Sequence, residues 1–141
     1  MITTLGAFTI VGTVGTDLLG RAIGASIDGL TNIYSFLSSS SVYNIQRYKD
    51  ELETMDIELK LNLINNWLQT NKDTSNKLIY NGVLDTCTKI TNLIEIIEDK
   101  IRIHNTKWFY TWRTLNLDTE IKQLYKYSKI LKERIPLLNF I

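Results

Sequence analysis

The chain of 141 residues is 44% hydrophobic and 22% charged, which suits one folded core and excludes both wholesale disorder and two full domains. Its 16 basic and 15 acidic residues leave a net charge of +1, which argues against a protein whose task is to neutralise many phosphates. A single cysteine, Cys87, excludes an internal disulfide and suits a reducing compartment. We therefore expect one domain overall, without a specific nucleic acid partner.

Glycine is concentrated at the start of the chain. Six of the seven glycines lie in the first 29 residues, and no charged residue precedes Asp17. Glycine weakens a water-exposed helix by about 0.5–1 kcal/mol relative to alanine, but it lets backbones approach closely. Residues 1–16 lack the basic residues of an export signal, and Asp17, Arg21 and Asp28 interrupt the run too early for a clean membrane span. Residues 1–38 are thus a Gly-rich apolar head for which membrane contact stays open.

Apolar residues at steps of three and four predict a helix in the second part of this head, ending near Ser38. The preceding residues, 3–16, fit a strand, a loop or a helix. Gly20 and Gly24 form a G-x-x-x-G pair, which suits close helix packing but also occurs by chance. A serine run at 38–41 separates the head from a helical body, residues 39–141. The positions of the head expected to pack against a neighbouring molecule are Leu19, Gly20, Ile23, Gly24 and Ile27.

Two helices are expected next. Residues 42–53 predict a short polar helix, and Thr54 is placed to cap a second helix over residues 55–69. The apolar face of the second helix is wide, which predicts burial on more than one side. Its members are Met55, Leu59, Leu63 and Trp67, with Ile57, Leu61, Ile64 and Leu68 beside them.

Two long helices follow, each with an apolar stripe that steps by four or three residues, as in a helical bundle. Asn116 is suited to cap the second of them, and Pro136 is expected to end or kink it. We expect the pair to be antiparallel and the fold class to be all-α, a bundle of about four helices. The tail residues Leu138, Phe140 and Ile141 are expected to pack against a neighbour. The first stripe consists of Ile79, Val83, Cys87, Ile90, Ile94, Ile97, Ile101, His104 and Trp108, and the second of Leu117, Ile121, Leu124, Ser128, Leu131, Ile135 and Leu138.

Reactive groups are few in this sequence. His104 is the only histidine and lies on the apolar stripe, where a core or boundary histidine is favoured over a catalytic one. Cys87 has no basic neighbour clearly placed to activate it, so a buried, inert thiol is favoured. The acidic residues at 51–58 and 95–99 have basic residues close by in the sequence, at 49, 60, 100 and 102, as on a solvated helix face. Because phosphate-binding and metal-ligand motifs are also missing, we expect no enzyme activity, no metal and no cofactor.

The most distinctive local run is KWFYTWR at residues 107–113. Aromatic residues beside basic ones suit a buried joint between helices, a partner or lipid headgroup surface, or single-stranded nucleic acid. The balanced charge and the place of Trp108 on the stripe favour the joint, with the partner or membrane surface second. The interaction residues expected in this run are Lys107, Trp108, Phe109, Trp112 and Arg113. A basic stripe on the last helix, Lys122, Lys126 and Lys129, is interpreted as a solvated face that could also meet an acidic partner or an anionic leaflet.

Several stretches of the chain carry a family resemblance. They are residues 19–24 (LGRAIG), 55–61 (MDIELKL), 104–109 (HNTKWF) with Trp112 and Arg113, 128–131 (SKIL) with Arg134, and Leu137 with Leu138. Together they resemble small helical proteins of nucleocytoplasmic large DNA viruses. The heavy use of Asn, Ile, Lys and Tyr is also typical of an AT-rich genome. The resemblance implies a virion component of the minor capsid type, beneath the outer shell and near the inner membrane, that is present in the host cytoplasm during assembly.

The expected function is therefore that of a non-enzymatic capsid or cement protein of a large icosahedral DNA virus. Its head and tail would be buried against other capsid proteins, with the inner membrane and a second copy of the chain as further partners. The alternative is a membrane-active effector, because a helical bundle led by a Gly-rich apolar helix also resembles the layout of HeLo-type cell-death domains. That second resemblance involves no shared motif, and an enzyme ranks third.

Overall fold

A computed structural model describes residues 15–42, 45–70 and 77–140, and these residues form an all-helical bundle with no strand among them. The predictions for residues 3–14 and for Ile141 fall outside the described residues. The α-helices are α2 (Gly15–Ser39), α3 (Gln46–Met55), α4 (Ile57–Thr70), α5 (Lys77–Asn105) and α6 (Asp118–Arg134), and two short 3₁₀ helices are η1 (Tyr110–Trp112) and η2 (Ile135–Phe140).

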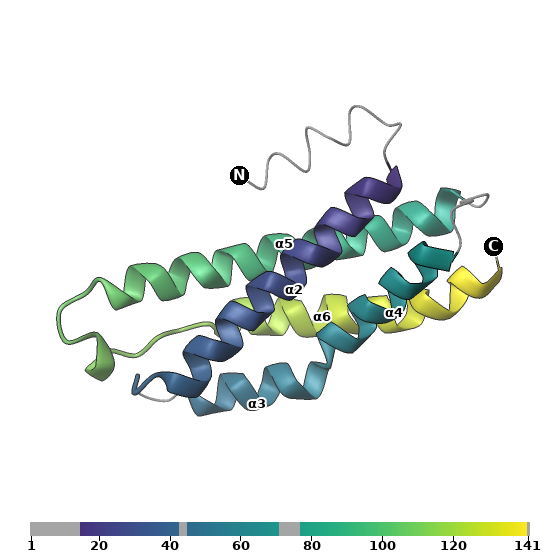
Figure 1. The fold of residues 1–141 in the computed structure, drawn as a ribbon. Helices are drawn as coiled ribbons and strands as arrows, with labels where there is room; N and C mark the ends of the chain where they lie inside the picture. The colour runs from purple at the N-terminus through teal and green to yellow at the C-terminus, as the bar shows by residue number, and fades with distance from the viewer. Residues whose placement is uncertain (1–14, 43–44, 71–76, 141) are drawn as a thin grey trace.

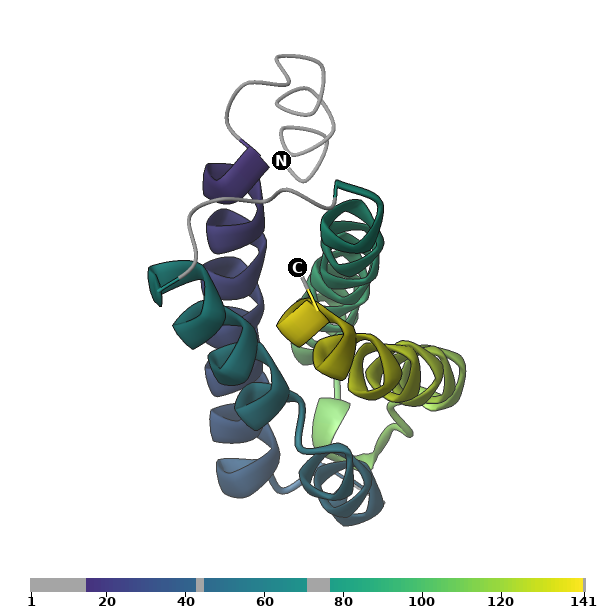
Figure 2. The ribbon, with the colours of Figure 1, turned by 90° about the vertical axis from the view of Figure 1, so that its right-hand side faces the viewer.

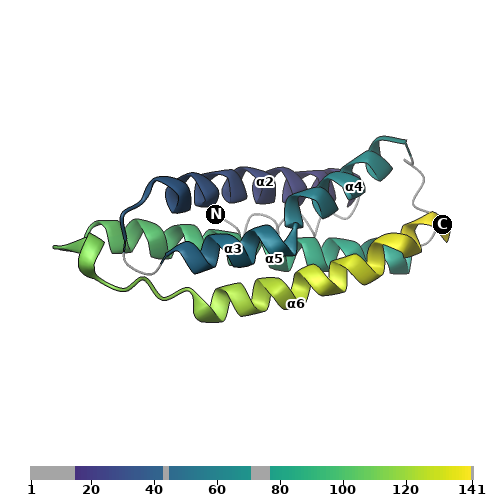
Figure 3. The same cartoon turned by 90° about the horizontal axis from the view of Figure 1, so that it is seen from below.

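The bundle consists of four helical arms, and each arm runs antiparallel to the next one in the chain (Figure 1). The first arm is α2, the second consists of α3 followed by α4, the third is α5 and the fourth is α6. Seen from the end, α2 and α4 lie on one side and α5 and α6 on the other (Figure 2). The view from below shows α6 running beside α5 in the opposite direction, as expected from the two stripes (Figure 3). Helix α2 contacts α5, α4 and α3, so the described part of the predicted head, residues 15–38, packs into the same bundle as the body.

Helices α2 and α5 approach closely at Gly29. A Cβ atom at this position would collide with the Cγ2 methyl of Ile94 and lie 2.9 Å from a carboxylate oxygen of Glu98. One turn away, the buried hydroxyls of Ser26 and Thr91 are 2.7 Å apart. Glycine is thus required here for close approach, whereas a Cβ at Gly20 or Gly24 would meet nothing within 4 Å. The G-x-x-x-G pair is therefore not a packing device inside the described bundle.

The second arm breaks at Asp56, which adopts the left-handed conformation with φ of 53° between α3 and α4. The predicted cap at Thr54 is wrong, because its hydroxyl donates to the carbonyl of Asp50 within α3. The carbonyl of Met55 instead accepts a hydrogen bond from Lys60 Nζ at 2.9 Å and one from the Ser128 hydroxyl at 3.2 Å. A helix end leaves carbonyls without intrahelical partners, and these side chains satisfy one of them.

Helix α4 is buried on one face, so the prediction of burial on more than one side is wrong. Leu59 and Leu63 are 53% and 47% exposed. The residues predicted to lie beside that stripe are the ones that face the core: Ile57, Leu61, Ile64 and Leu68.

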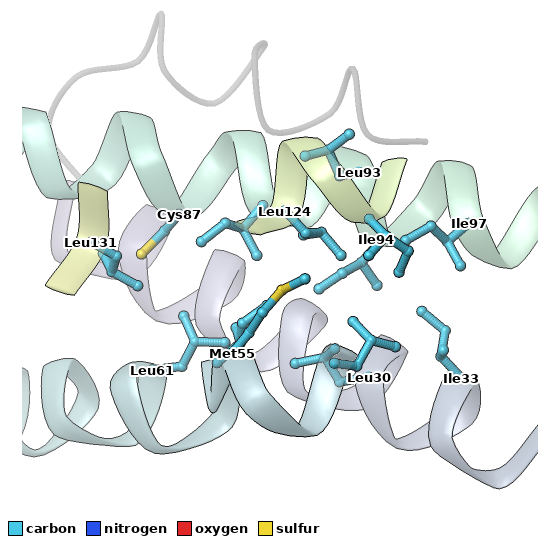
Figure 4. Close-up of a cluster of buried hydrophobic side chains, with 14 of the residues drawn as sticks. Leu30, Ile33, Met55, Leu61, Cys87, Leu93, Ile94, Ile97, Leu124 and Leu131 are labelled. Atoms are coloured by element: carbon cyan, nitrogen blue, oxygen red, sulfur yellow. The ribbon is translucent and has the colours of Figure 1, made fainter. Parts of the chain in front are cut away.

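The apolar stripes of α5 and α6 form most of the remaining core. Figure 4 shows Leu30 and Ile33 from α2, Met55 from α3 and Leu124 from α6 directed toward side chains of α5. The predicted α5 stripe is buried from Val83 through His104, and α6 ends at Arg134, before Pro136. Trp108 was wrongly placed on the α5 stripe, because α5 ends at Asn105.

We expect Gly29→Ala to lower the free energy of unfolding by about 1–3 kcal/mol, because the added methyl overpacks the contact between α2 and α5. Gly24→Ala is the matched control, since it adds the same methyl to open space in the same helix and is expected to raise stability by up to about 1 kcal/mol. Urea denaturation of both variants measures the difference. Equal effects at the two positions would contradict the close contact.

Candidate functional site: an exposed aromatic loop

The residues between α5 and α6 form a loop at one extremity of the bundle, on the left in Figure 1. At its tip, Trp108, Phe109 and Trp112 are 81%, 64% and 77% exposed. The interpretation of this run as a buried joint between helices is therefore wrong. Single exposed apolar residues are ordinary, but three large exposed aromatic side chains within five residues make this loop the candidate interaction site. We call residues 107–113 the aromatic loop.

The aromatic rings of the loop have a defined arrangement. Phe109 and Trp112 stack with ring centroids 5.5 Å apart and an interplanar angle of 11°, and Trp108 lies tilted beside Phe109 at 6.4 Å. Phe109 has φ of 54°, a left-handed conformation that is costly for a bulky side chain. Backbone strain of this kind persists where surrounding contacts impose it, and it gathers at functional sites.

The start of the loop is tied to the end of α5. The imidazole Nε2 of His104 lies 2.8 Å from the carbonyl oxygen of Tyr110 and donates its proton there, and the Tyr110 ring meets the imidazole edge-on. Arg113 Nε donates to the carbonyl of Trp108 at 2.7 Å, which closes the loop on itself. His104 is buried, as predicted, and its role in this structure is to position the loop.

The connection between α5 and α6 is tied to α3 at its far end, just beyond the aromatic loop. The buried Tyr48 hydroxyl accepts a hydrogen bond from the backbone N–H of Leu117 and donates one to the Asp118 carboxylate, both at 2.9 Å. Arg47 Nη2 lies 2.9 Å from the same carboxylate oxygen. The hydrogen bond from Tyr48, followed by that from Arg47, lowers the pKa of Asp118 below its ordinary value. Asn116 also contributes, because its side-chain oxygen accepts from the N–H of Asp118.

The loop carries positive charge only. Residues 100–117 contain four basic residues and no aspartate or glutamate. Two of the four, Lys100 and Arg102, pair with Glu120 and Asp99. The other two, Lys107 and Arg113, are exposed and flank the aromatic tip.

The other predicted interaction residues lie elsewhere. Leu19 and Ile23 are buried in the bundle core and Ile27 packs against that core, so these three positions contact the chain itself. Gly20 and Gly24 border open space. In the tail, Leu138 is also buried in the core, whereas the Phe140 side chain and Ile141 lie outside what the structure describes.

Two potentially reactive groups, a thiol and a lysine–serine pair, have structural roles. Burial raises the pKa of the Cys87 thiol to about 12, which keeps it protonated and unreactive. Lys60 Nζ lies 2.7 Å from the Ser128 hydroxyl, a pairing that can activate a serine in some hydrolases. However, Ser128 is only 1% exposed and its hydroxyl donates to Met55, so no substrate could reach it. Burial, followed by the charge of Lys132, lowers the pKa of Lys60.

A cleft of about 570 Å³ lies between α3 and α6. It is lined by charges of both signs, and its Arg47 and Asp118 are already paired with one another. The cleft therefore offers no concentrated charge for a ligand.

Within the three described segments, no three His, Cys, Asp or Glu side chains gather closely enough to hold a metal ion. None of the helices described has the length and apolar character needed to cross a bilayer. Comparison with protein-family models, with curated proteins and with solved structures finds no match.

Asp118→Asn is expected to reduce stability at neutral pH and to lose its effect in acid. Because the folded-state pKa of Asp118 is lowered, its carboxylate stabilises the fold above the usual pKa of about 3.9 and loses that contribution as the pH falls through the lower folded value. Melting temperatures measured between neutral pH and acid should converge for the two proteins. Parallel curves would show that the carboxylate does not hold the loop end.

His104→Phe is expected to loosen the aromatic loop, because the phenyl ring fills the same space but cannot donate to the Tyr110 carbonyl. The loss of one hydrogen bond should cost about 1 kcal/mol. Hydrogen exchange should become faster at residues 107–113 while the helices keep their protection. Asn105→Ala, one residue further on and exposed, is the control that should leave this exchange unchanged.

Proposed function

We propose that this protein is a non-enzymatic structural component of an assembly and that the aromatic loop is its point of attachment. The observation that carries this proposal is the exposure of Trp108, Phe109 and Trp112 on a loop held at both ends. A folded chain gains stability by burying such rings, so leaving three of them in water is costly without a partner. Tryptophan, tyrosine and arginine are also the residues that most often dominate interaction surfaces.

The rigidity of the loop supports this role. The ties from His104 and Tyr48 set the position of the tip before any contact forms. Binding by a preorganised loop avoids part of the entropy cost of ordering side chains. The helical core behind the loop acts as a scaffold. The potentially reactive groups, Cys87 and the Lys60–Ser128 pair, are part of the packing and hydrogen bonding of that core.

The setting we propose is the capsid of a large icosahedral DNA virus, where the chain would be a minor capsid or cement protein beneath the outer shell. This part rests on the sequence resemblance and on the burial of Cys87 and Ser128 in the bundle core. Other capsid proteins are the proposed neighbours, with the inner membrane and a second copy of the chain as further contacts.

Quantitative mass spectrometry of gradient-purified virus particles tests this function. We expect a fixed ratio of the chain to the major coat protein across independent preparations. In particles made with Trp108→Ala/Trp112→Ala, the ratio should fall at least about tenfold, because the attachment point is lost. A chain absent from particles, or a variant incorporated at the normal ratio, would contradict the proposal.

Folding of the variant is the necessary control. Both tryptophans are largely exposed, so the double replacement should leave the melting temperature within a few degrees of the parent value. Leu78→Ala, which removes an 84% exposed side chain at the start of α5, should leave both stability and incorporation unchanged.

The alternative function is a membrane-active effector, which the exposed aromatic and basic residues of the loop also favour. An effector would release dye from anionic liposomes, whereas a structural component would not. Dye release together with absence from particles would replace the capsid proposal by this one.

A further inference from the structure

We infer that the aromatic loop binds the headgroup layer of an anionic membrane, with Trp108, Phe109 and Trp112 entering the interface between water and lipid tails. This inference rests on the proposed attachment role of the loop and names its partner. The juxtaposition that carries it is an aromatic tip at the extremity of the bundle, flanked by Lys107 and Arg113.

The composition of the loop matches the chemistry of a membrane interface. Tryptophan and tyrosine rings are enriched at the headgroup level, where one part of the ring contacts lipid and the polar edge stays hydrated. Lysine and arginine can keep their charges among phosphates while their alkyl stems contact apolar surface. Beyond the tip, the exposed side chains of Asn105, Thr106 and Thr114 are polar and uncharged, so nothing charged would be forced into lipid with the rings.

The charge of the loop is complementary to an anionic leaflet. No acidic residue occurs between Asp99 and Asp118, so lipid phosphates would meet only cations along this segment. Each lysine or arginine near such a surface contributes favourably, and the contribution decays within a Debye length. The chain as a whole has a net charge of only +1, so an attraction to anionic lipid must come from a local group such as this one.

The shape of the site favours lipid over a protein partner. A stable protein interface usually buries about 800 Å² per partner, with a central cluster surrounded by a rim of further contacts. Here the exposed aromatic residues belong to the connection between α5 and α6, which lies at one extremity of the bundle (Figure 3). A loop in this position can enter a soft headgroup layer without a wide complementary face around it.

The ring arrangement also disfavours single-stranded nucleic acid. Proteins that bind single strands offer free ring faces on which bases stack and a basic groove that follows the backbone. Phe109 and Trp112 stack on each other at 5.5 Å, so each already covers one face of the other. Insertion into lipid requires only that the pair be exposed as a unit.

Vesicle co-sedimentation of the full chain tests the inference. Vesicles of phosphatidylcholine alone are compared with vesicles that also contain phosphatidylserine. We expect binding to the anionic vesicles and at least about tenfold weaker binding to the neutral ones, because the flanking cations contribute only with the former. Trp108→Ala/Trp112→Ala should weaken binding to anionic vesicles by about tenfold or more, since two large apolar contacts are lost.

Two control variants locate the contact. Tyr125→Ala removes an exposed aromatic ring from α6 and should bind as the parent does. Lys107→Gln should weaken binding to anionic vesicles more than Lys129→Gln, which removes an exposed lysine from α6. Lys107 is chosen because Arg113 also holds the Trp108 carbonyl and its replacement would change the loop itself.

The inference is overturned if the full chain binds neither vesicle, or if the double tryptophan variant binds as well as the parent. The second result would place the membrane contact elsewhere in the chain. Failure here is distinguishable from failure of the proposed function. If the double variant is lost from virus particles while the parent protein binds neither kind of vesicle, the loop attaches to protein and only the lipid inference is wrong.

Discussion

The contact between α2 and α5 at Gly29 is the constraint on which the bundle depends. It places the Gly29 backbone against Ile94 and lets the buried hydroxyls of Ser26 and Thr91 reach each other at 2.7 Å. A buried polar pair is tolerated only when its hydrogen bonds are made, so this pair specifies one register between the two helices. With that register set, the apolar stripe of α5 faces the other arms, and the end of α5 determines where the loop begins.

The loop receives its geometry from this core through two polar ties of different kinds. His104 is the last buried residue of the α5 stripe, and its Nε2 atom donates to the Tyr110 carbonyl. Tyr48 lies in α3, about seventy residues before Leu117, and its hydroxyl accepts a hydrogen bond from the Leu117 backbone N–H. A side chain that is anchored in the core at one end and bonds the loop at the other transmits the rigidity of the core to the tip. The loop thus combines solvent exposure with a fixed shape.

Sequence periodicity predicts the helices well and their ends less well. The α5 stripe is confirmed from Val83 to His104, because every step of three or four residues there faces the same core. The same spacing continues to Trp108, but it cannot show that α5 stops at Asn105 or that Phe109 adopts a left-handed conformation. The break between α3 and α4 is predicted to within about two residues, but its position at Asp56 is not, since the Met55 carbonyl is bound there by Lys60 and by the distant Ser128. Similarly, nothing near Tyr48 in the sequence indicates its bonds to Leu117 and Asp118.

The three tryptophans of the chain differ in their contact with the core. Trp67 packs against the core, whereas Trp108 and Trp112 do not, although the same polypeptide could gain stability by burying them. The hydrogen bonds from His104 and Arg113 to backbone carbonyls oppose burial of the two rings, because they hold the loop in a conformation that keeps both rings in water. This arrangement suits the attachment role that we propose for the loop, since it keeps the rings outside the fold before contact and fixes them in place, which lowers the entropy cost of binding.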